Sequence, residues 1–74
     1  MTTPPLTHTI DGSSLIASVA YSHHATLDVT FHGGSRYRYF TVPASVVRDL
    51  LTASSAGTYF NRYIRTRYRY QRLD

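Results

Sequence analysis

Cysteine and lysine are both absent from this sequence of 74 residues, and each absence narrows what the protein can be. Without cysteine the chain can form neither a disulfide nor a thiolate metal site, and nothing indicates an oxidising compartment. Without lysine all eight Lys/Arg positions are arginine, which gives a net charge of +4 against four acidic residues. Guanidinium groups stack on aromatic rings and bind phosphate or carboxylate through paired hydrogen bonds.

Long apolar runs are missing as well. No stretch approaches the ~20 apolar residues that a membrane span needs. Residues 1–12 lack the basic region followed by an apolar segment that marks a secretory signal, so we expect none. The expected protein is cytoplasmic and makes no membrane contact.

The residue constellations typical of enzymes do not occur. A chain this short folds as one domain with a thin core, which leaves little material for the walls of an enclosed catalytic cleft. The acids are Asp11, Asp28, Asp49 and Asp74, and none forms an obvious pair with a base and a nucleophile. The histidines are His8, His23, His24 and His32, and none stands at a familiar metal-ligand spacing. We therefore predict a non-enzymatic protein without catalytic residues, metal or cofactor.

Three short stretches have the composition and alternation of strands. Residues 1–12 are rich in threonine and proline and lack periodicity, so we expect a flexible arm followed by a single domain over residues 13–74. The predicted strands cover residues 15–21, 26–32 and 35–42, joined by tight turns into an antiparallel meander. Strict alternation places Leu15, Ala17, Val19 and Tyr21 on one face of the first strand and Ile16 on the other.

Two helices are predicted after the strands. Pro43 suits a helix start, and Val46, Val47, Leu50 and Leu51 repeat with helical spacing over residues 43–53. Ser54 or Ser55 is a candidate N-cap for a second helix that ends near Arg67. The conformation of residues 68–74 stays open between helical, extended and frayed. The predicted fold is α+β, with a βββαα order and both helices packed on one face of the three-stranded sheet.

The hairpin at Gly33-Gly34 allows two strand registers with different consequences. A two-residue loop opposes Phe31 to Arg36 and exposes Tyr37 and Tyr39 as stacking platforms. A three-residue loop from His32 to Gly34, with Gly34 in the left-handed conformation, opposes Val29 to Tyr37 and Leu27 to Tyr39. The second register is preferred because it buries both tyrosines and points Arg36 and Arg38 outward with Asp28, although it leaves Phe40 on the open side.

The sequence resembles the KTSC domain, a C-terminal extension of some lysyl-tRNA synthetases. The segments that carry the resemblance are SSLI (13–16), LDVTF (27–31), the Tyr37-x-Tyr39 pair, VP (42–43) and ASSAGTYFN (53–61), followed by Ile64 and Tyr68. The most specific pattern is Ala53, Ser55, Gly57, Tyr59, Phe60 and Asn61. The resemblance implies a domain type, and the association with a synthetase implies RNA as a ligand to test. The family often has proline near position 69, where this chain has arginine.

The clearest functional signal is the arginine-rich C-terminal segment interleaved with tyrosine. Its candidate nucleic-acid-binding residues are Arg62, Arg65, Arg67, Arg69, Arg72, Tyr68 and Tyr70, and Arg36 and Arg38 could extend the patch. If the second helix continued, Arg62, Arg65, Arg69 and Arg72 would form one stripe along a phosphate backbone, with a log–log salt slope of about −3. The alternative function is a protein-interaction or self-associating module, since a three-stranded meander leaves two open edges.

Overall fold

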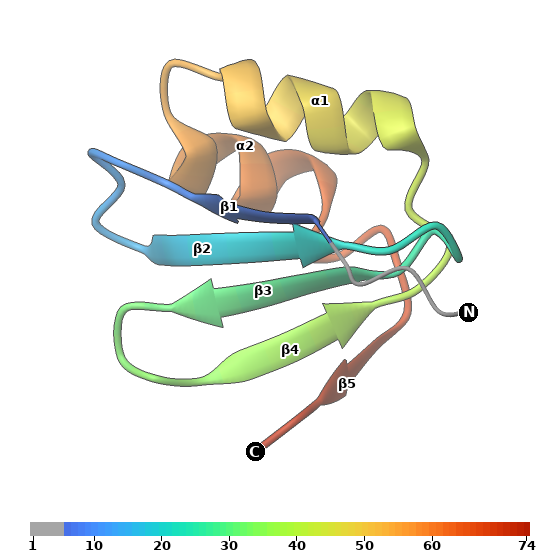
Figure 1. The fold of residues 1–74 in the computed structure, drawn as a ribbon. Helices are drawn as coiled ribbons and strands as arrows, with labels where there is room; N and C mark the ends of the chain where they lie inside the picture. Colours follow the sequence, from blue (N-terminus) through green and yellow to red (C-terminus); the bar gives the residue numbers. More distant parts are fainter. Residues whose placement is uncertain (1–5) are drawn as a thin grey trace.

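The computed structural model describes residues 6–74 and shows an α+β fold with one antiparallel sheet and two helices (Figure 1). The elements in chain order are β1 (Leu6–Thr9), β2 (Ile16–Tyr21), β3 (Leu27–Phe31), β4 (Arg36–Tyr39), α1 (Ala44–Thr52), α2 (Ala56–Tyr63) and β5 (Tyr70–Arg72). The three predicted strands and both predicted helices are therefore present. Neither helix in this range is long and apolar enough to cross a membrane.

The sheet has five strands, so the predicted three-stranded meander is incomplete. The spatial order is β1-β2-β3-β4-β5, the same as the order along the chain. β1 pairs with β2 and lies within residues 1–12, which were expected to form a flexible arm. Residues 1–5 of this segment lie outside the described range. β5 pairs with β4 and is made from the C-terminal segment. The two strands that were expected to be open edges are thus covered by β1 and β5.

Both helices cover the same face of the sheet (Figure 1). The core between the two layers consists of buried apolar residues from β2, β3, β4 and the helices. They are Ile16, Val19, Leu27, Val29, Tyr39, Val42, Val47, Leu50, Ala56, Phe60 and Ile64. Neither helix covers the opposite face of the sheet (Figure 1), where Arg38 and Asp28 form an ion pair.

The β3–β4 hairpin adopts the preferred register. Val29 pairs with Tyr37 and Leu27 pairs with Tyr39, so the two tyrosines lie on the helix-covered face. The Phe31 N–H donates to the Ser35 carbonyl at 2.9 Å, and Gly34 has a φ of +98°, a conformation that favours glycine. Tyr39 is buried and Tyr37 is half-buried. The three-residue loop thus decides which side of the sheet receives the aromatic rings.

A bulge in β2 corrects the face predicted for Ile16. Ile16 pairs with Phe31, whereas Ser18 pairs with Thr30, so one extra residue lies between them on β2. Strict alternation would place Ile16 opposite to Val19, but the bulge turns both side chains into the core, where Ile16 is 0% and Val19 is 1% exposed. The start of β2 therefore contributes one more aliphatic side chain to the core than the alternation predicted.

Candidate nucleic-acid interface

A cleft lined mainly by aromatic rings opens at the side of the molecule. One wall is formed by α2 and the turn that follows it, and the other wall by strands β3 to β5. Its volume is about 490 Å³. The aromatic residues that line it are Phe31, Tyr37, Tyr39, Phe60, Tyr68 and Tyr70. Asn61, Arg65, Thr66, Ser35 and Leu15 complete the lining. We call this feature the aromatic cleft, and its volume falls in the range of small-ligand sites.

Strand pairing brings the rings of the aromatic cleft together. Tyr39 pairs with Tyr70, and Tyr37 pairs with Arg72, across β4 and β5. Directly opposed residues of antiparallel strands share a face, so all four side chains lie on the helix-covered side. The Tyr39 ring lies 5.7 Å from Tyr70 and 5.4 Å from Phe60 between centroids. The cleft thus has a continuous aromatic surface that leads from the core to the edge strand.

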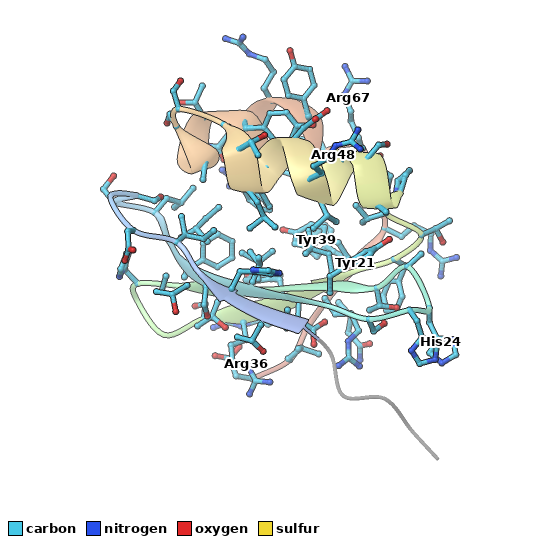
Figure 2. All side chains as sticks on the ribbon, turned by 45° about the horizontal axis from the view of Figure 1, so that its top comes forward. Tyr21, His24, Arg36, Tyr39, Arg48 and Arg67 are labelled. Atoms are coloured by element: carbon cyan, nitrogen blue, oxygen red, sulfur yellow. The ribbon has the colours of Figure 1, made fainter. Side chains whose placement is uncertain are left out.

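Tyr39 forms the buried end of this surface. Figure 2 shows its side chain between the helices and the sheet. Burial raises the pKa of Tyr39 to about 12, and the positive charge of Arg65 opposes that rise. The phenol hydroxyl therefore stays protonated at neutral pH and can donate a hydrogen bond. Arg65 and Tyr39 both line the aromatic cleft.

Arg65 is exposed and is the one charged residue among those that line the aromatic cleft. It follows the end of α2, where the Ile64 and Arg65 N–H groups both donate to the Phe60 carbonyl, at 3.0 and 2.9 Å. Its Nη1 donates to Oδ1 of Asn61 at 3.4 Å, four residues earlier in the chain. Asn61 was not among the predicted site residues. The sequence feature that could have identified Asn61 is its position in the most specific pattern, where it is a polar residue without a core role.

The C-terminal segment is extended, so the single arginine stripe that a longer helix would have made does not form. α2 ends at Tyr63, and Arg72 lies in β5. The Arg72 guanidinium carbon lies 6.0 Å from the centroid of the Tyr37 ring, within range of a cation–π contact. Its Nε also approaches Oδ1 of Asp74 at 3.3 Å. Arg72 therefore lies beside the aromatic cleft, on the same side as Tyr37.

The other predicted arginines are divided between two further surfaces. Figure 2 shows Arg67 beyond the helices and Arg36 below the sheet, on opposite sides of the molecule. The Arg67 guanidinium carbon lies 5.9 Å from the centroid of the Tyr63 ring. Arg62 is exposed on α2, one turn before Arg65. Of the nine predicted residues, Arg65, Tyr68 and Tyr70 line the aromatic cleft and Arg72 borders it.

Arg38 is engaged on the uncovered face of the sheet. It pairs with Asp28 through two hydrogen bonds, from Nε at 2.8 Å and from Nη2 at 3.0 Å. Arg38 and Asp28 thus lie on the same face of the sheet, as the preferred register predicted. Arg69 supplies the carbonyl that accepts from the Phe40 N–H at 2.9 Å, which continues the β4–β5 ladder by one bond. Neither residue lines the aromatic cleft.

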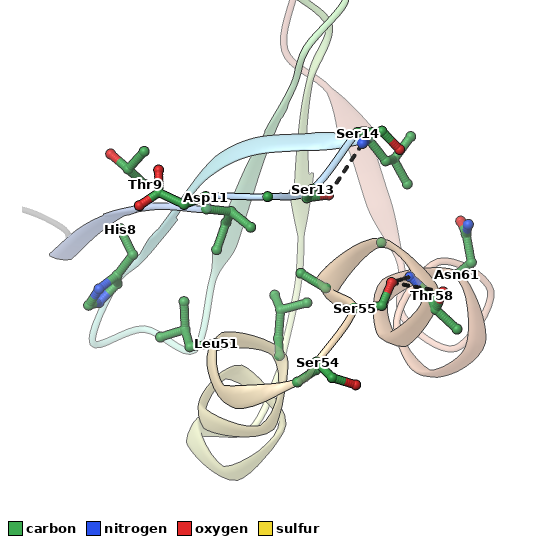
Figure 3. Close-up of a pocket in the computed structure, with 17 residues that line it drawn as sticks. His8, Thr9, Asp11, Ser13, Ser14, Leu51, Ser54, Ser55, Thr58 and Asn61 are labelled. Atoms are coloured by element: carbon green, nitrogen blue, oxygen red, sulfur yellow. Dashed lines mark hydrogen bonds between the residues drawn. The ribbon is translucent and has the colours of Figure 1, made fainter.

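A second pocket, of about 720 Å³, lies between the β1–β2 connection and the start of α2 (Figure 3). Its lining is rich in serine, but two of the serines have local structural roles. Ser13 Oγ accepts from the N–H groups of Leu15 and Ile16, and Ser55 Oγ accepts from the Thr58 N–H. Residues 6–74 contain no group of three His, Cys, Asp or Glu side chains that could hold a metal ion. Ser13 thus stabilises the entry into β2, and Ser55 is the N-cap of α2, as one of the two predicted candidates.

Comparison with known proteins gives consistent matches. A family model described as the KTSC domain matches residues 12–68. The chain is 39% identical over 62 residues to a lysine–tRNA ligase of Nostoc punctiforme, which is 82% of this chain but 11% of the ligase. It is 42% identical over 64 residues to an uncharacterized protein of Stutzerimonas stutzeri, which is 84% of this chain and 90% of that protein. This chain therefore spans about a tenth of the ligase and most of the second relative.

A solved structure shares the fold. It is the KTSC domain protein YPO2434 from Yersinia pestis, which matches with a TM-score of 0.85 and 24% sequence identity. The match covers 95% of this chain and 99% of that chain. This match supports the fold described above.

Proposed function

The chain belongs to the KTSC domain family, and we propose that it is a small non-enzymatic module that binds single-stranded RNA through the aromatic cleft. The observation that carries the proposal is the aromatic surface from Tyr39 to Tyr70, with Arg65 at its rim. Bases of a single strand stack on aromatic side chains, whereas the faces of bases in a duplex are already stacked on one another.

The charge distribution supports an anionic ligand at this place. Arg65 lines the aromatic cleft, Arg72 borders it, and Arg62 lies one turn before Arg65. Residues 6–74 form three ion pairs, and neither Arg62 nor Arg65 takes part in any of them. Their charges are available to phosphates on either side of a stacked base.

The relatives favour RNA as the ligand to test first. The ligase of Nostoc punctiforme is named for tRNA, and a region similar to this chain occupies 11% of its length. Binding, rather than catalysis, agrees with the chemistry of the aromatic cleft, because its lining holds one arginine and no carboxylate, histidine or cysteine. Tyrosine hydroxyls and Arg65 supply hydrogen-bond donors and positive charge, which suit recognition.

The test is an NMR titration of the ¹⁵N-labelled chain with short single-stranded RNA, single-stranded DNA and duplex RNA at two salt concentrations. We expect the amides of Arg65, Tyr68 and Tyr70 to shift with single strands at low salt, and to shift less at higher salt. The Asp49 amide, which lies on α1 and outside the lining of the aromatic cleft, is the internal control. Unchanged amide signals around the aromatic cleft with every nucleic acid would refute the proposal.

The second candidate, self-association through a sheet edge, now involves other strands. The edges are β1 and β5, which have four and three residues. Short edge strands offer few unpaired backbone groups to a second chain. The same NMR samples distinguish the two functions, because self-association would broaden the amide signals of β1 or β5 with increasing protein concentration in the absence of nucleic acid.

A further inference from the structure

The aromatic cleft has the features of a site for one base as well as for a strand. Its walls are rings, and its one charged group is the guanidinium of Arg65. An aromatic wall stacks with every base and so provides affinity without selection. Any choice between bases must come from the polar groups at the rim, of which Arg65 has the largest number of donors.

Arg65 is restrained in a way that leaves most of its donors unused. Its Nη1 donates to Asn61 Oδ1 at 3.4 Å, and this is the one side-chain hydrogen bond of Arg65 within residues 6–74. Asn61 also lines the aromatic cleft, so the bond holds the guanidinium next to the opening. A guanidinium has five N–H groups in a planar fork, so donors remain for a ligand.

The chemistry of the fork selects among bases. Guanine presents two adjacent acceptors, N7 and O6, which match two parallel guanidinium N–H groups. Adenine presents an acceptor and a donor at the corresponding positions, so one arginine donor would face the adenine amino group. Arginine has no acceptor with which to satisfy that group. Of the two purines, whose large faces suit the tyrosine walls, guanine is therefore the match.

On the basis of the proposed function, we infer that the aromatic cleft accepts a single unpaired guanine of an RNA strand. Tyr70 and Tyr68 pack against the base, and Arg65 donates to guanine N7 and O6 while Asn61 holds the arginine in place. Arg62, which takes part in none of the three ion pairs within residues 6–74, then remains for a flanking phosphate.

The test measures fluorescence anisotropy with labelled oligouridine RNAs that carry one central guanine, adenine, cytosine or uracil. The guanine RNA should bind roughly 5- to 150-fold more tightly than the adenine RNA, the range for one good bidentate contact. Arg65→Met removes all five donors, so the preference should fall to about two-fold or less, while stacking on the tyrosines retains part of the binding. Asn61→Ala should also reduce the preference for guanine, because Asn61 holds the Arg65 guanidinium in place. Arg36→Lys changes a side chain on the uncovered face of the sheet and should leave the preference unchanged.

Each result has a defined meaning. Equal affinity for all four RNAs would overturn the guanine site and leave the proposed RNA-binding function standing. A guanine preference that survives in Arg65→Met would also overturn it, because another group would then select the base. Failure of every RNA to bind would refute both proposals. Thermal unfolding of each variant, together with the amide spectrum, checks that a lost preference is not lost folding.

Discussion

Tyr39 and Tyr70 lie directly opposite each other on β4 and β5, with their ring centroids 5.7 Å apart. The two tyrosines differ in exposure: Tyr39 is 3% exposed and Tyr70 is 59% exposed. Tyr39 therefore belongs to the core, whereas Tyr70 presents an aromatic face to solvent. Because Tyr70 is so exposed, it can be replaced without emptying the core, which makes it a suitable position for testing function apart from stability.

Removing the Tyr70 ring should weaken RNA binding with little effect on folding. Tyr70→Ala should lower the affinity for single-stranded RNA roughly 5- to 150-fold, the equivalent of about 1–3 kcal/mol for one stacked base. Tyr70→Phe retains the ring and should bind nearly as tightly as the natural chain. Tyr63→Ala is the matched control, since Tyr63 is also exposed but does not line the aromatic cleft. Equal losses in the Tyr70→Ala and Tyr63→Ala variants would argue against the cleft.

The salt dependence of RNA binding should reflect the few arginines near the aromatic cleft. Two or three phosphate contacts predict a slope of log K against log salt of about −1.5 to −2. Arg62→Ala should make the slope shallower by about 0.7. Arg36→Ala, on the far side of the sheet, should leave the slope unchanged. A slope near −3 would instead indicate that Arg67 or Arg69 also contacts the strand.

Ionisation of Tyr39 should destabilise the fold at high pH. Its pKa is raised by burial to about 12 in the folded chain, against an ordinary value of about 10. The folded state thus holds the phenol proton more tightly than the unfolded state. This contribution is complete below pH 10 and is lost as the pH rises towards 12.

The measurement is the urea unfolding midpoint between pH 9 and pH 12 for the natural chain and for Tyr39→Phe. The midpoint of the natural chain should fall more steeply above pH 10. Burial also raises the pKa of Tyr59, so the variant should retain part of the decline. Parallel pH profiles for the two proteins would contradict the assignment of the effect to Tyr39.

The N-cap of α2 should contribute measurably to stability. Ser55 Oγ accepts from the Thr58 N–H at 3.3 Å, which satisfies one of the free donors in the first turn. Ser55→Ala should lower the free energy of unfolding by about 1 kcal/mol, and Ser55→Asp should keep most of it. Ser54→Ala is the control, because Ser54 is exposed and is not the cap residue. Urea denaturation of the three variants would fail to support the cap if Ser54→Ala cost as much as Ser55→Ala.

Much of the fold could be predicted because local signals and packing agreed. Gly33-Gly34 allowed two registers, and the burial of Tyr37 and Tyr39 favoured the three-residue loop. The structure has that register, with Gly34 at positive φ. Ser55 was one of two candidate caps and is the one used. The bulge in β2 could not be predicted from the sequence. Ile16 and Val19 are three residues apart, so regular alternation places them on opposite faces, and only the packing of the core turns both side chains inward.

The two missed strands had signals that other patterns outweighed. Asp11-Gly12 is a typical turn dipeptide, and Gly12 has a φ of +81° after β1, but the threonine- and proline-rich composition indicated an arm. In the C-terminal segment, Tyr68 and Tyr70 alternate with Arg69 and Gln71, as in a strand. The helical spacing of the arginines competed with that alternation. The aromatic cleft depends on the end of α2 at Tyr63, so it could not be predicted until the tail was known to be extended.

The pairing of β5 with β4 links ligand binding to the order of the chain end. In every other pair of neighbouring strands, no helix lies between the two strands in the sequence. Between β4 and β5, the chain forms both helices. Closing that long loop costs chain entropy, and three residues of ladder return few hydrogen bonds. β5 should therefore detach by local opening at a lower free energy than the rest of the sheet. Since Tyr70 belongs to β5, a base held against Tyr70 and Tyr68 would keep this strand docked, and a docked strand would bind the base more tightly.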